Sequence, residues 1–142
     1  MHARYDDPYE DLLGLWSDLE AALAVLLTEP LRIPGFAIKL HQLDLWLQDL
    51  ITQDSDAALY LMFQRASSTT VGYSPSHAVV CAGLCHILAK ELDLPQSERD
   101  TLIQAALTMN IGMTVLQNQL AEQRTPLSSQ QAEAVKQHPT EG

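Results

Sequence analysis

The chain has 142 residues, of which 46% are hydrophobic, and 18 acidic against 8 basic residues give it a net charge of −10. This length and apolar content suit one folded domain with a core and exclude an intrinsically disordered chain. The surplus of negative charge repels phosphate backbones and anionic lipid headgroups, so we expect neither nucleic acid nor a membrane as a partner.

Two features of the sequence indicate the cytoplasm. No basic segment leads into an apolar one near the start, and the longest apolar run, residues 21–27, is far shorter than the roughly 20 residues of a membrane-spanning helix. Cys81 and Cys85 are the two cysteines of the chain, and such a pair does not suggest a disulfide framework.

Residues 1–72 are expected to form an N-terminal helical segment. Apolar side chains recur every three or four positions over residues 8–28 and again over residues 36–50, which is typical of amphipathic helices, and prolines separate the two runs. A third helix is expected to begin at Asp54 or Ser55, because either side chain can cap it.

Two longer helices are expected after residue 72. Ser74 followed by Pro75 is typical of a helix cap with proline at the first helical position, and we expect that helix to extend to about residue 92. The next helix is expected from about residue 97 to about residue 110.

The last part of the chain predicts two more helices. Gly112 stands where glycine commonly ends a helix, and a short helix is expected over residues 114–122. The segment 128–131 matches a capping box and begins a last helix that extends to about residue 137. No useful stretch alternates polar and apolar residues. The sequence therefore predicts an all-α fold, a helical bundle of about six or seven helices in which the two halves of the chain pack as one unit.

Five short motifs follow one another after residue 72. They are Tyr73-Ser74-Pro75-Ser76-His77, Leu92-Asp93-Leu94, Ala105-Ala106-Leu107-Thr108-Met109-Asn110-Ile111-Gly112-Met113, Thr125-Pro126-Leu127-Ser128 and His138-Pro139-Thr140-Glu141-Gly142. In order and spacing, they resemble the opening half of a domain of the HD superfamily of metal-dependent phosphohydrolases, above all its HD-GYP branch. The resemblance covers residues 73–142 and implies an HD-like helical domain in that half of the chain.

The central motif departs from the family's pattern at the residues that carry its chemistry. Where the family has A-A-L-x-H-D-I-G-K, this chain has Met109 and Asn110 in place of the His-Asp pair and Met113 in place of the lysine. The family's pair binds divalent metal ions that orient the attacking water, whereas a thioether and a neutral amide are poor ligands for Mn, Fe or Mg. The resemblance thus implies a set of vestigial site positions: His77, Met109, Asn110, Met113 and His138.

These replacements lead us to expect no catalytic residue, no metal and no cofactor. His77 and His138 keep the family's histidines and are weak candidates for metal ligands. An aspartate buried without its metal would be a costly unpaired charge, so the loss of both members of the pair is physically consistent. We expect Met109 and Asn110 to fill the former site as an inert, packed region.

The resemblance implies a catalytically inactive domain that acts in bacterial signalling as a regulatory or protein-interaction module. A protein partner or a homo-oligomer is expected, and a nucleotide, cyclic dinucleotides above all, is the ligand class that the family suggests. The alternative is a metal-dependent phosphohydrolase or cyclic-dinucleotide phosphodiesterase that uses Mn or Fe and a modified ligand set completed by residues beyond 142. A third hypothesis is a plain helical interaction domain whose resemblance to the family is accidental.

Two further sets of residues have a functional and a structural interpretation. His77, Cys81 and Cys85 share one helix face and form a candidate metal site, although free cysteines more often pack as small core residues. Trp16 and Trp46 are candidate anchors of a protein interface, and they are equally compatible with the domain's own core.

Overall fold

The computed structural model describes residues 8–66 and 72–142. This part of the chain forms seven α-helices and two short 3-10 helices without any strand, which confirms the predicted all-α class. The elements in chain order are α1 (Pro8–Thr28), η1 (Pro30–Arg32), α2 (Phe36–Gln53), α3 (Ser55–Ala66), α4 (Tyr73–Glu91), α5 (Gln96–Thr108), η2 (Ile111–Met113), α6 (Thr114–Glu122) and α7 (Ser129–Glu141).

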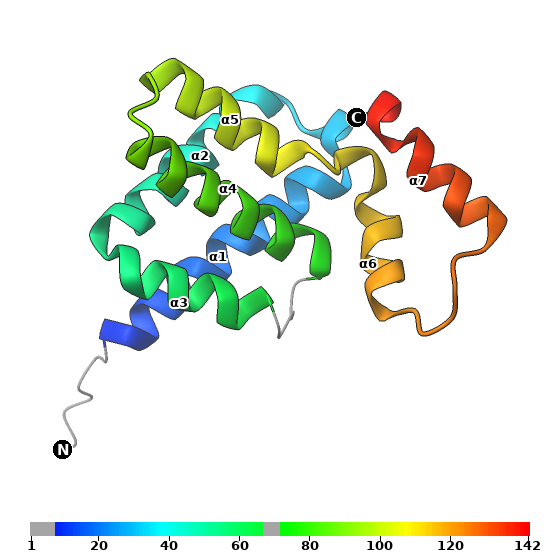
Figure 1. The fold of residues 1–142 in the computed structure, drawn as a ribbon, viewed down its shortest axis with the longest axis horizontal. Coiled ribbons are helices and arrows are strands. Elements are labelled where there is room, and N and C mark those ends of the chain that lie inside the picture. The colour runs from blue at the N-terminus through cyan, green and yellow to red at the C-terminus, as the bar shows by residue number, and fades with distance from the viewer. Residues whose placement is uncertain (1–7, 67–71) are drawn as a thin grey trace.

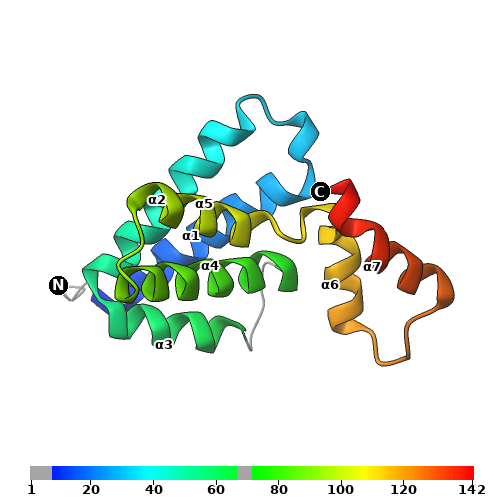
Figure 2. The same ribbon diagram turned by 45° about the horizontal axis from the view of Figure 1, so that its top comes forward.

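Helix α4 is the centre of the bundle. It packs against α1, α2, α3, α5 and α6, so helices from both halves of the sequence meet on it. Helices α6 and α7 lie together at one end of the molecule, where α6 packs beside the group formed by α1 to α5, as Figures 1 and 2 both show. Helix α7 makes its main contact with η2, the short element that joins α5 to α6.

The core is built mainly from the apolar faces of the first three helices. Trp16 is completely buried in it, and α4 and α5 close it with small and branched side chains such as Val79 and Ile103. Full burial of one large aliphatic side chain stabilises a fold by about 1.5–3 kcal/mol, so this leucine-rich face is the main source of stability. The buried leucines are Leu19, Leu23, Leu26, Leu27, Leu40, Leu43, Leu47, Leu50, Leu61 and Leu107.

Two of the predicted helix starts are confirmed at atomic detail. The Asp54 carboxylate accepts a hydrogen bond from the backbone N–H of Ala57 at 3.0 Å, which caps α3. Ser128 and Gln131 form the predicted capping box of α7: each accepts a hydrogen bond from the other's backbone N–H, at 3.1 and 2.9 Å.

The prediction of Ser74 as the cap of α4 is wrong. The helix begins at Tyr73, two residues before the expected first position Pro75, and its N-cap is Gly72, which has a φ of 114° that other residues rarely adopt. The backbone N–H of Ser74 instead donates to the Asn118 side chain of α6 at 2.7 Å. A side chain distant in sequence therefore supplies the cap, which local sequence patterns cannot reveal.

The expected end of α7 near residue 137 is also wrong, because the helix continues through Pro139 to Glu141. Proline has no N–H to donate to the carbonyl of Val135, four residues earlier. The Nδ1 atom of His138 lies 2.5 Å from that carbonyl oxygen. The imidazole thus donates the hydrogen bond that Pro139 cannot make, and the helix tolerates the proline.

None of the helices in the described segments combines the length and the apolar character that crossing a membrane would require.

Candidate functional site

Gly112 brings two of the five motifs into contact. A Cβ atom at this position would lie 2.6 Å from the carbonyl oxygen of His138 and 3.0 Å from the backbone nitrogen of Gly142, too close for any side chain. Gly112 lies in η2 with no positive φ, so it is not the left-handed helix stop that the sequence suggested. The position requires glycine because the last turn of α7 packs directly on this backbone.

Met109 and Asn110, two of the positions that the sequence resemblance singled out, lie at the junction of α5 and η2. Asn110 is half-buried with φ −112° and ψ 19°, and its carbonyl accepts a hydrogen bond from the N–H of Met113 at 2.9 Å. Met109 is 43% exposed. The expectation that Met109 and Asn110 fill an inert, packed site is therefore wrong for Met109, which is an exposed residue.

His138 lies on the same side of the molecule as η2, and one of its ring nitrogens already has a partner. Because a carbonyl oxygen only accepts, Nδ1 carries the proton in its contact with Val135. In this tautomer Nε2 carries the lone pair of the ring, and it is the atom that a metal ion would contact. His138 thus combines a structural role at the helix end with one remaining site for chemistry.

His77 lies in the first turns of α4, half-buried against neighbours of its own helix. Its ring stacks on that of Tyr73 with centroids 5.4 Å apart and an interplanar angle of 12°. Its Nε2 atom is 3.7 Å from the sulfur of Cys81. Within the described ranges, no hydrogen bond links His77 to Asn110 or to His138, so the structure joins His138 to the Gly112 segment but leaves His77 outside that contact.

The two cysteines near His77 are poorly prepared for metal binding. Burial raises the pKa of Cys81, and the neighbouring Cys85 raises it further; burial alone raises the pKa of Cys85. Metal ions bind the thiolate form, which these shifts disfavour at neutral pH. Among the residues that the structure describes, no three His, Cys, Asp or Glu side chains converge in a way that could hold a metal ion.

A buried carboxylate that sequence analysis did not single out lies between α2 and α5. Asp44 is completely buried and accepts hydrogen bonds from the side-chain amides of Gln48 at 2.6 Å and Gln104 at 3.2 Å. His41 Nδ1 lies 3.9 Å from it. The signal was present in the sequence, because Asp44 interrupts the run of apolar residues that marks the inner face of α2.

The negative charge of Asp44 affects the pKa of His86 in the neighbouring helix α4. The side chain of His86 is 8% exposed, and its buried Nδ1 atom has no hydrogen-bond partner. Burial lowers the pKa of His86, and Lys90 and Arg99 lower it further, whereas Asp44 opposes the shift. The fold therefore holds this imidazole in its neutral form.

A second buried charge joins three helices. The carboxylate of Glu20 in α1 receives two hydrogen bonds from the guanidinium of Arg65 in α3, both at 3.0 Å, and lies 3.3 Å from the hydroxyl of Ser76 in α4. Glu20 is 3% exposed. Such a bidentate pair fixes the mutual orientation of its helices, and it provides no site for a ligand because every group in it is already bonded.

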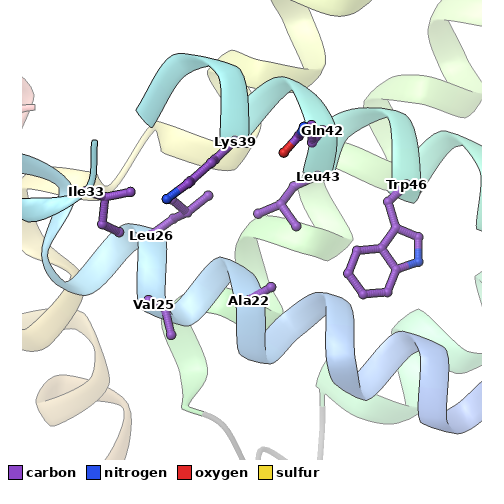
Figure 3. Close-up of a pocket in the computed structure, with 8 residues that line it drawn as sticks. All are labelled: Ala22, Val25, Leu26, Ile33, Lys39, Gln42, Leu43 and Trp46. Atoms are coloured by element: carbon purple, nitrogen blue, oxygen red, sulfur yellow. The ribbon is translucent and has the colours of Figure 1, made fainter. Parts of the chain in front are cut away.

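The two tryptophans have different environments. Trp16 is 0% exposed and belongs to the core, which favours the core interpretation of this side chain over the interface one. Trp46 is half-buried and lines a cavity of about 500 Å³ between α1 and α2. Of the two candidate anchors, only Trp46 offers a surface to another molecule (Figure 3).

Comparison with known proteins finds no relative of this chain. No protein-family model matches the chain, and neither a curated protein nor a solved structure is significantly similar to it.

Proposed function

We propose that this chain is a catalytically inactive, HD-like domain that acts in the bacterial cytoplasm as a regulatory or protein-interaction module of a signalling system. The observation that carries the proposal is the contact of Gly112 with the last turn of α7. Two segments that resemble metal-binding motifs of one family lie against each other there, although they are about 26 residues apart. The side chains at the ligand positions of the first segment are uncharged.

The chemistry of these side chains supports the absence of catalysis. Phosphodiester hydrolysis by this family needs bound cations that lower the pKa of water and stabilise the charge on phosphorus. Met109 offers a soft sulfur and Asn110 a neutral amide, and neither compensates the charge of Mn²⁺ or Fe²⁺. His77 and His138 alone lack the negative charge that a pair of metal ions requires.

A hydrolysis assay tests this proposal against the alternative of a metal-dependent phosphodiesterase. The purified chain is incubated with Mn²⁺ or Fe²⁺ and either bis(p-nitrophenyl) phosphate or a cyclic dinucleotide. We expect no turnover above that of the metal alone. Turnover that is lost in both the His77→Ala and the His138→Ala variants would overturn the proposal and establish the enzyme.

The interaction role has a separate test. Sedimentation of the purified chain at micromolar concentration measures whether it self-associates, and the chain can be used as bait for a partner from its own cell. We expect a defined oligomer or a stoichiometric complex that survives moderate salt. A chain that stays monomeric and recovers no stoichiometric partner would contradict the role as an interaction module.

A further inference from the structure

The cavity between α1 and α2 has the shape of an open bowl. Leu26 and Leu43, both buried, form its floor, and the two helices form its sides. Ile33, just before α2, stands at one end, and Trp46 stands at the other (Figure 3). Its volume of about 500 Å³ falls within the range of roughly 300–1,000 Å³ that is common for small-molecule sites.

One end of this bowl is positively charged. Lys39 is the charged side chain that lines it, and Figure 3 shows its ammonium group directed toward Leu26 and Ile33. Within the described part of the chain, Lys39 has no ion-pair partner. It lies in the first turn of α2, which has no acidic residue and no side-chain cap. A cation at the positive end of a helix dipole is unfavourable, and an anion bound there would offset both charges.

We infer that this cavity binds a small amphipathic anion, such as a medium-chain carboxylic acid, with its apolar chain on Leu26 and Leu43 and its carboxylate beside Lys39. The apolar floor and sides match the chain, and the single ammonium group at one end matches the head group. This site is separate from the HD-like motifs and goes beyond the proposed function.

The size of the cavity favours a small molecule over a helix of another protein. A helix with its side chains is about 10–12 Å wide and extends along a groove over several turns. A cavity of about 500 Å³ instead matches the volume of one small ligand. The net charge of −10 repels anions and attracts cations non-specifically. Saturable binding of an anion would therefore require a specific site on this chain.

The test is a titration of the chain with decanoate below its micelle concentration, followed by tryptophan fluorescence and by calorimetry. We expect saturable binding, and we expect octanoate to bind about tenfold more weakly because it has two fewer CH₂ groups. Decyltrimethylammonium, with the same chain and the opposite charge, should bind more weakly than decanoate. The fluorescence change should vanish in Trp46→Phe, since Trp16 is buried in the core.

Three variants locate the site. Lys39→Gln should weaken decanoate binding about two- to fivefold, as expected for an exposed charge contact, while Lys136→Gln on α7 removes the same charge elsewhere and should leave binding unchanged. Ala22→Leu fills the cavity and should abolish binding, with circular dichroism to verify its fold.

Three results would overturn the inference. The first is decanoate binding that does not saturate or that Lys39→Gln leaves unchanged. The second is decyltrimethylammonium binding as tightly as decanoate, which would indicate apolar partition alone. The third is an absence of amphiphile binding together with a changed oligomeric state in Ala22→Leu, which would make this surface a contact between protein chains.

Discussion

The backbone contact at Gly112 positions the last turn of α7. A methyl group at this position would lie 2.6 Å from the carbonyl oxygen of His138, which is backbone and cannot rotate away. We expect Gly112→Ala to displace α7 and to cost about 1–3 kcal/mol, the usual penalty of overpacking. Hydrogen exchange of the α7 amides should show the displacement as faster exchange in that helix.

A matched control for this substitution exists in the same chain. Gly14 is an exposed glycine of α1 where an added Cβ would meet no atom within 4 Å. Gly14→Ala should be neutral or should stabilise the fold by up to about 1 kcal/mol, because alanine favours the helix. Equal effects of the two substitutions on the free energy of unfolding would contradict the close approach of α7.

His86 makes the stability of the fold depend on pH. Its pKa in the folded state is lowered, chiefly by burial, so the unfolded chain binds a proton more readily than the folded one. The stabilising contribution is therefore complete above the ordinary pKa of histidine, near 6.5, and declines as the pH falls below it. We expect the free energy of unfolding to decrease between pH 7.5 and pH 5.5.

Replacement of His86 tests this assignment. The variant His86→Met removes the titrating group and should lose less stability than the wild type over the same pH interval. If His86→Met retains the full dependence, another group is responsible.

At the scale of helices, the Glu20–Arg65 pair ties α1 to α3. Loss of one partner leaves a buried charge uncompensated, so Arg65→Met should destabilise the fold by about 3–5 kcal/mol. The double variant with Glu20→Met should recover most of that loss, because no unpaired charge remains. Chemical denaturation of the two single variants and of the double variant measures both effects.

The exposed Arg32–Glu29 pair, with an N–O distance of 3.2 Å, is the control for this cycle. We expect Arg32→Met to change the free energy of unfolding by less than about 1 kcal/mol, since solvent screens exposed pairs. A similar loss in Arg32→Met and Arg65→Met would show that burial of the pair has no special effect.

The helices themselves were largely predictable from the sequence, because their apolar spacing and their caps are local. The spans 8–28 and 114–122 agree with the structure, as do the caps at Asp54 and Ser128. Errors arose where a side-chain contact that the sequence pattern does not show decides the structure. The cap of α4 comes from Asn118, and the path of α7 through Pro139 depends on a side-chain contact.

The candidate site was predictable only in part. The resemblance implied that Met109, Asn110 and His138 belong to one vestigial site, and the structure places the backbones of Gly112 and His138 in contact. The buried Asp44 and Glu20 were missed: their place on apolar helix faces was visible in the sequence, but their partners Gln104 and Arg65 lie on other helices. Likewise, the exposure of Met109 and the burial of Trp16 follow from how the helices pack, which periodicity alone does not give.

At the scale of the whole molecule, our central proposal is that the chain lacks charge at the positions where an HD-type site would carry metal ligands. Introducing such ligands tests this proposal directly. In the double variant Met109→His/Asn110→Asp, an imidazole and a carboxylate are placed beside the Gly112–His138 contact. The single variant Asn110→Asp serves as a control for added negative charge alone.

The measurement is calorimetric titration of Mn²⁺ into the wild type and into these variants, with metal analysis of each protein as purified. We predict no stoichiometric binding by the wild type, and tight binding by the double variant that is lost again when His138→Ala is added to it. Stoichiometric, tightly bound Mn²⁺ or Fe²⁺ in the wild type would contradict the account.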